Sequence, residues 1–453
     1  MTALDKIKTT ISIPLLTNIN REYFIYTIKY RQNNIVKYIL HYHEDKINIV
    51  DSSNPAFRYA CRWGNIEVVK YLCTMYATMH KSENEYNRKA NITYMLNHAF
   101  VDACDGGSLE VVKYLCEEYA IKYPKMYMGA AYEYKINIAH QSNEAFIEAC
   151  NRGSLEVVKY LCEEYGKIIN IADRKNLAFI NACRGGYLEV VKYLCEEHGD
   201  KINIADQSNE AFISACFWGK IEVVKYLCEY YEEIINIADQ ENEAFISACI
   251  RNQIEVVKYL CEYYGEIINI ADRKNLAFIE VCSNGKIEVV KYILCYHVDK
   301  INIADQENKA FICACGRGYI KVVKYLCENH LQTFINNNLQ QEYINEAFEL
   351  LLNNNIVCLN LIEYIDKDIY EDNIKKIATI LTYDTAEYFI LTRNLAKEKY
   401  NRKININAIE FRQVEELIEK KNKIISYFDC VPPKFINGQL SRNYEDGLLL
   451  VQG

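Results

Sequence analysis

The stretch "NEAFISACFWGKIEVVKYLCEYYEEIINIADQE" (209–241) holds two apolar patterns, and a glycine separates them. In "AFISAC" (211–216) the apolar residues fall at i, i+1, i+4 and i+5, which predicts a helix with one buried face. Gly219 is free to adopt a positive φ and is expected to end that helix. "KIEVVKYLCEYY" (220–231) predicts a second helix. "INIAD" (235–239) alternates like a short extended segment that leads into a turn.

This stretch is one unit of a repeat. The phrase "EVVKYLC", or a near copy of it, recurs every 33 residues, with its first valine at Val157, Val190, Val223, Val256, Val289 and Val322. Upstream copies at Val111 and Val68 follow longer steps, so two units carry insertions, near 74–96 and 117–136. A single unit of this size cannot bury both of its helices, whereas stacked units share a continuous core. The sequence therefore predicts an all-α solenoid.

The repeat resembles the ankyrin-repeat family. The resemblance rests on the 33-residue period, on the "A-C-x-x-G" and "V-V-K-Y-L-C" steps, and on the Asn-x-x-Asp of "NIAD" (203–206 and 236–239). One departure is that the family's Thr-Pro-Leu-His is replaced by "EAFI" (210–213). The resemblance implies an ankyrin-repeat solenoid of about ten helix-turn-helix units with short hairpin-like turns and helical end caps.

The chain is expected to divide into four parts. These are an N-terminal segment (1–20), the repeat array (21–365), a helical C-terminal cap or degenerate repeat (366–430) and an irregular tail (431–453) that opens with two prolines. The second insertion is rich in tyrosine and methionine, and it is expected either to bind a partner or to cover its own repeats.

Composition excludes several classes of function. The formal net charge of -9 argues against a nucleic-acid binder, because a protein needs a basic surface to attract the phosphates of nucleic acid. No signal peptide and no membrane-spanning segment are expected, so we predict an intracellular, cytoplasmic protein. We also expect it to be a monomer. The Asn-, Ile-, Lys- and Tyr-rich style resembles that of ankyrin proteins from amoeba-infecting giant viruses, which would place the protein in the host cytoplasm.

No catalytic or cofactor motif is found, and an enzyme is not expected. Fifteen of the 19 cysteines fall at the "A-C" or "L-C" step, where the family has small or branched apolar core residues. We interpret them as reduced core residues that bind no metal, because zinc needs paired ligands at short spacing.

Positions that differ between units are free to serve a partner. The pair before the glycine and the turn after the recurring aspartate both vary, and by the family resemblance both line a concave groove that grips a partner protein. Trp and Arg also dominate interface energetics. The predicted partner-binding residues are Arg62, Trp63, Arg152, Arg184, Phe217, Trp218, Arg251 and Arg317. The predicted function is a protein-protein interaction scaffold. The alternatives are a substrate adaptor of a ubiquitin ligase, or an enzyme with its chemistry in the C-terminal region.

Overall fold

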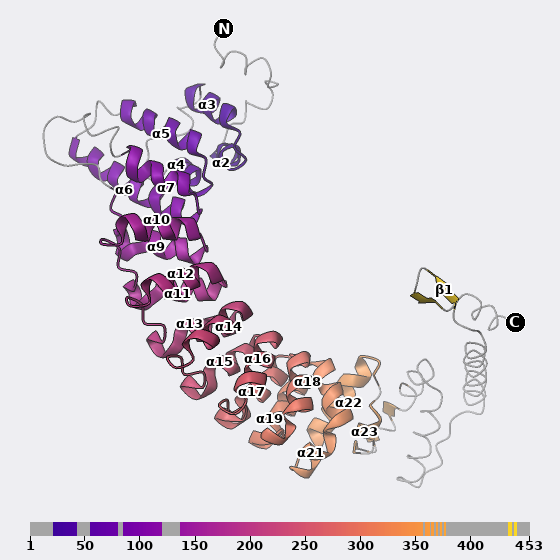
Figure 1. The fold of residues 1–453 in the computed structure, drawn as a ribbon. Helices are drawn as coiled ribbons and strands as arrows, with labels where there is room; N and C mark the ends of the chain where they lie inside the picture. Colours follow the sequence, from indigo (N-terminus) through magenta and orange to yellow (C-terminus); the bar gives the residue numbers. More distant parts are fainter. Residues whose placement is uncertain are drawn as a thin grey trace. The chain divides into compact units, whose positions relative to one another are not determined.

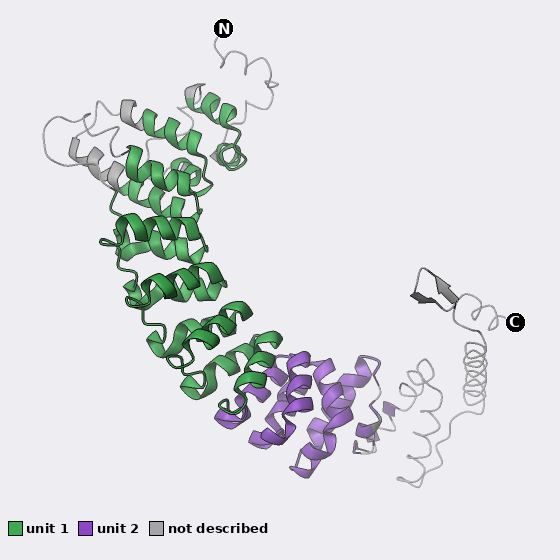
Figure 2. Ribbon diagram, viewed as in Figure 1, with its two compact units in different colours: residues 1–269 green, residues 270–453 purple. Residues whose placement is uncertain are grey.

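The computed structural model describes residues 21–42, 55–79, 85–119 and 136–356, together with 358–362, 364–366, 368–369, 372–373, 376, 434–436 and 439–441. The chain divides into two compact units, residues 1–269 and 270–453 (Figure 2), which are described separately below. The N-terminal segment and most of the second insertion and of residues 366–453 lie outside the described residues.

The first unit consists of helix pairs stacked in two layers (Figure 1). The first helices of successive repeats form one layer: α2 (Arg21–Lys29), α4 (Pro55–Arg62), α6 (Glu85–Asp105), α9 (His140–Asn151), α11 (Asp173–Gly185), α13 (Asp206–Phe217) and α15 (Asp239–Ile250). The second helices form the other: α3 (Asn33–Tyr42), α5 (Ile66–Met79), α7 (Leu109–Lys113) with the π-helix η3 (Tyr114–Tyr119), α10 (Leu155–Tyr165), α12 (Leu188–His198), α14 (Ile221–Tyr231) and α16 (Ile254–Tyr264).

The second unit continues the same alternation of helices. Its elements are α17 (Asp272–Ser283), α18 (Ile287–Tyr296), the 3-10 turn η4 (Val298–Lys300), α19 (Asp305–Gly316), α20 (Ile320–Asn329), α21 (Leu331–Asn336), α22 (Gln341–Asn353) and α23 (Leu359–Ile362). Near the C-terminus, β1 (Lys434–Ile436) pairs antiparallel with β2 (Gln439–Ser441). The sequence pattern did not predict this pair within residues 431–453.

The repeats share one core in each unit. In every first helix from α4 to α15, one phenylalanine is at most 1% exposed: Phe57, Phe100, Phe146, Phe179, Phe212 and Phe245. The paired valines of the second helices and the cysteines of the "A-C" step are also buried. The predicted solenoid of stacked helix pairs is thus confirmed, with these cysteines as apolar core residues.

Two expected local features differ in detail. The first insertion is helical at its edges, because α5 runs on to Met79 and α6 begins at Glu85. The "INIAD" segments form turns rather than strands, although their isoleucines alternate inward as predicted; for example, Ile235 and Ile237 are each 3% exposed.

In each first helix from α9 to α19, the first residue is followed by three residues in the left-handed conformation. In α13 these are Gln207, Ser208 and Asn209, with φ of 52°, 57° and 64°. Left-handed backbone costs an ordinary L-residue about 1–2 kcal/mol. Asparagine, which tolerates this conformation better than most residues, always holds the third place.

The asparagine in this third place links neighbouring repeats through its side chain. Asn176 donates to Asp206 of the next repeat at 2.5 Å and accepts from the backbone N–H of Asn203 at 3.4 Å. Asn209 likewise donates to Asp239 at 2.7 Å. These buried amides form a ladder that runs from turn to turn and offsets the strain of the left-handed residues.

Candidate functional site

The residues that precede each helix-ending glycine lie at the ends of the first helices, as the sequence predicts. Gly219 has a φ of 67°, and where the glycine is replaced by Asn252 the φ is 61°. The chain must turn sharply at this point because the second helix begins two residues later. The variable pair therefore recurs at the same place in each repeat. We call the set of these pairs the helix-end band.

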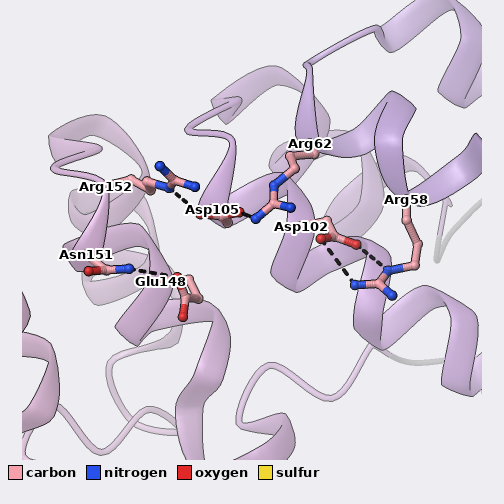
Figure 3. A network of polar contacts seen from close by, with 7 residues as sticks. All are labelled: Arg58, Arg62, Asp102, Asp105, Glu148, Asn151 and Arg152. Atoms are coloured by element: carbon pink, nitrogen blue, oxygen red, sulfur yellow. Dashed lines mark hydrogen bonds and ion pairs between the residues drawn. The ribbon is translucent and has the colours of Figure 1, made fainter. Parts of the chain in front are cut away.

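In the N-terminal repeats the band is an internal ion-pair network (Figure 3). Asp105, whose side chain is 4% exposed, is paired with Arg62 of the preceding repeat and with Arg152 of the following one, the latter at 2.5 Å. Beside it, Arg58 forms two hydrogen bonds with Asp102, which raise the pKa of its guanidinium. A buried carboxylate needs such partners because an unpaired charge is costly to desolvate. Arg62 and Arg152 thus each hold one repeat against the next.

The ring of Trp63 packs against neighbouring side chains of the same protein. Its ring stacks on that of Tyr59 at 4.9 Å between centroids, and the Lys29 ammonium lies 5.9 Å from it. Its carbonyl accepts a hydrogen bond from Arg31, the residue that stands where the first repeat lacks the helix-ending glycine. Trp63 is half-buried as a result.

The band has a different character at α13 and α15. Trp218 is 47% exposed and packs edge-on against Phe217 at 5.3 Å. The Arg251 guanidinium, from the next repeat, lies 4.1 Å from the Phe217 ring and 5.2 Å from the Trp218 ring. Such cation–π contacts contribute about 0.5–1 kcal/mol at exposed sites, and they favour an arrangement in which the three side chains lie together.

Arg184, one repeat earlier, is exposed at the end of α11. It forms no hydrogen bond or ion pair with any residue that the structure describes. We call Arg184, Phe217, Trp218 and Arg251 the aromatic patch. In the second unit, Arg317 donates to the Ser283 carbonyl at 2.7 Å and so links two repeats.

The turn that follows the recurring aspartate also varies in sequence, but its first residue has a structural contact. Gln207 donates to the Lys175 carbonyl of the preceding turn at 3.3 Å, and Arg174 donates in the same way to the Gln141 carbonyl. Variation at this place therefore does not by itself indicate a binding residue.

Sequence reasoning missed Asp105 as the centre of the network. A comparison of neighbouring units could have found it, because Asp105 occupies the position of Arg62 and lies between two arginine-bearing repeats. The aromatic patch, by contrast, was included in full among the predicted residues.

The thiols give no indication of chemistry at the "A-C" step. Burial raises the pKa of Cys216, Cys249 and their counterparts well above the ordinary value, which disfavours the reactive thiolate. At the "L-C" step burial raises the pKa of Cys162 to about 11, although a hydrogen bond with Tyr193 lowers it. Cys358 differs, because a hydrogen bond with Cys327 lowers its pKa.

Among the described residues, no group of three or more His, Cys, Asp or Glu side chains is arranged to hold a metal ion. None of the helices in the same part of the chain combines the length and the apolar character that crossing a bilayer requires.

A family model described as ankyrin repeats (3 copies) matches residues 24–127, 125–206 and 203–272, and so spans more than half of the chain. No curated protein matches the sequence.

Proposed function

Because the chain belongs to the ankyrin-repeat family, we propose that it is a scaffold that binds a partner protein through the aromatic patch. Members of this family generally act as protein-protein interaction modules and are typically not enzymes.

The observation that carries the proposal is the exposure of Trp218. A tryptophan with nearly half of its surface exposed to water is unfavourable, and neighbouring repeats place glycine or arginine at the same position. Packing of the repeats therefore does not require an aromatic residue here. Tryptophan and arginine held in a fixed arrangement are the residue types that contribute most to binding energy.

The other predicted residues have a lesser part in this proposal. Arg62, Arg152 and Arg317 contact neighbouring repeats, and Trp63 is stacked on Tyr59, so their side chains are already engaged. We propose that these four residues stabilise the helix-end band and do not contact the partner. We propose direct contact with the partner for the four residues of the patch.

Site-specific photo-crosslinking tests the proposal. A photoreactive phenylalanine derivative replaces Trp218 in the full chain. In a matched control it replaces Lys159, an exposed residue of the second-helix layer on α10. Crosslinked protein should be recovered from expressing cells with position 218 and not with position 159. Equal crosslinking at both positions, or none at 218, would contradict the proposal.

A role as the substrate adaptor of a ubiquitin ligase remains the alternative within binding. It would use the patch for the substrate and residues 366–430 for docking to the ligase. The same crosslinking in a chain that ends at residue 365 tests it: an adaptor would keep the substrate and lose the ligase. Cytoplasmic location, a monomeric state and a viral origin belong to this proposal as expectations from the sequence.

A further inference from the structure

A second exposed apolar surface lies on the second-helix layer of the first unit, away from the helix-end band. It consists of the last turns of α14 and α16 and the loops that follow them, residues 229–234 and 262–267. We call it the tyrosine edge. The two helices are neighbours in the stack (Figure 1), so the two segments lie side by side.

Four large side chains of the tyrosine edge face solvent. Tyr230 and Tyr263 are 64% and 70% exposed, and Ile234 and Ile267 are 54% and 53% exposed. The following isoleucine in each loop is buried and already serves the core. Both loops are held in the same geometry, because the Ile234 and Ile267 N–H groups each donate at 3.0 Å to the carbonyl three residues earlier. The exposed side chains therefore project from a fixed backbone.

Stacking of the repeats does not explain these residues. The positions of the two tyrosines are occupied by Glu164 and Glu197 in the two preceding repeats, and the position of the isoleucines is occupied by Lys201 in one of them. The other repeat has Ile168 there, but both repeats stack in the same way without the tyrosine. Two adjacent rows of apolar side chains are thus an addition to the repeat, of the kind that marks an interaction surface.

The charge around the tyrosine edge restricts what can bind there. Its two segments contain five glutamates, Glu229, Glu232, Glu233, Glu262 and Glu266, and no lysine or arginine. All five are exposed, and none forms an ion pair with a residue that the structure describes. Nucleic acid and anionic lipid would be repelled, and so would the same edge of a second copy. A basic partner with apolar side chains complements this surface.

The spacing favours a helical partner. Helices that pack in neighbouring layers lie about 8–10 Å apart. Residues seven apart on an α-helix are separated by about 10.5 Å along its axis. A helix laid across α14 and α16 could therefore place the apolar residues of successive heptads against successive tyrosine–isoleucine pairs.

We propose that the tyrosine edge binds a lysine- or arginine-rich amphipathic helix of a second protein. This surface is separate from the aromatic patch, and its partner goes beyond the proposed function. A chain that uses both would hold two proteins at once, one at the first-helix ends and one on the second-helix layer.

Fluorescence anisotropy with a defined probe tests the proposal. The probe is a labelled synthetic helix of about five turns, with leucine at its heptad core positions and lysine elsewhere. One control probe replaces leucine with serine, and another replaces lysine with glutamate. The protein is the full chain, its double variant Tyr230→Glu with Tyr263→Glu, or the control variant Ile168→Lys. Ile168 is exposed at the position of Ile234 in a repeat outside the tyrosine edge. Because other repeats carry glutamate at the tyrosine positions, the double variant should fold normally.

In the double variant, the two explanations predict opposite changes in affinity for the lysine probe. The variant adds negative charge while removing the aromatic rings, so attraction by charge alone predicts tighter binding of the lysine probe. Docking on the tyrosine edge predicts binding at least about tenfold weaker, with Ile168→Lys and Trp218→Ala unchanged. Equal or tighter binding by the double variant would overturn the proposal. So would failure of the native chain to bind the lysine–leucine probe, or equal binding of the serine or glutamate probe.

Discussion

Replacement of Asn176 by alanine should be among the most damaging single changes in the turns. Its amide donates to the Asp206 carboxylate at 2.5 Å, and a hydrogen bond to a charged group contributes about 1.5–3 kcal/mol. Its oxygen also accepts from the Asn203 N–H, whose loss as a partly buried donor costs about 1 kcal/mol more. At a φ of 59°, alanine pays about 1 kcal/mol that asparagine largely avoids. We expect the free energy of unfolding to fall by about 4 kcal/mol in total.

Two further variants separate these causes. Asn176→Gly removes the same hydrogen bonds but accepts the left-handed backbone, so it should cost about 1 kcal/mol less than alanine. Lys175→Ala is the matched control: Lys175 lies in the same left-handed turn, with a φ of 57°, and its side chain is exposed. It should change stability by less than about 0.5 kcal/mol.

Urea unfolding followed by circular dichroism measures these differences. Long repeat arrays can unfold in steps, so hydrogen exchange of the amides in α11 and α13 should accompany the titration and locate the loss. A cost below about 1 kcal/mol for Asn176→Ala, or a cost equal to that of Lys175→Ala, would refute the role given to the asparagine ladder.

Three other predictions concern the helices. Burial lowers the pKa of His198 below its usual 6.5, so the unfolded chain binds more protons and stability should fall as pH is lowered through 6.5. His198→Tyr, which copies Tyr231, should reduce this fall in melting curves at pH 7.5 and 5.5, and an unchanged pH dependence would contradict the assignment. Cys216→Ser should lower the free energy of unfolding by about 1–3 kcal/mol and Cys216→Ala by less, because a hydroxyl is placed in a fully buried contact; rapid native-state labelling of Cys216 would show that it is not buried. Arg152→Ala should lower the free energy of unfolding by about 1 kcal/mol or less, because the arginine is half exposed. It should leave the affinity for the partner unchanged. A titration that shows weaker binding would mean that Arg152 contacts the partner.

The sequence predicted the features of the fold that depend on local pattern. The apolar spacing of "AFISAC" and the glycine at 219 specify a helix and its end within a few residues, and six copies in phase specify a stack. The left-handed turn could not be predicted in the same way. Gln207 and Ser208 have no intrinsic preference for positive φ, and the contact that supports Asn209 lies 30 residues away in Asp239.

The candidate site shows the same limit. Variation between repeats predicted both tryptophans as binding residues, because they occupy equivalent positions. The repeat pattern does not describe their neighbours. The ring of Trp63 contacts Tyr59 and Lys29 and is half-buried, whereas the ring of Trp218 contacts Phe217 and Arg251 and remains exposed. The ion pair between Arg152 and Asp105 could not be predicted from the repeat period either, because the two residues are 47 positions apart and an insertion lies between them.

Trp218→Ala gives the most direct test of the account as a whole. The partner recovered by crosslinking is titrated against the native chain and the variant, and a melting curve is recorded on the same samples. The account predicts a melting temperature close to that of the native chain and binding weaker by at least about 1–2 kcal/mol, because the exposed ring serves the partner and not the stack. A large fall in melting temperature with unaltered affinity would contradict it and make Trp218 a packing residue.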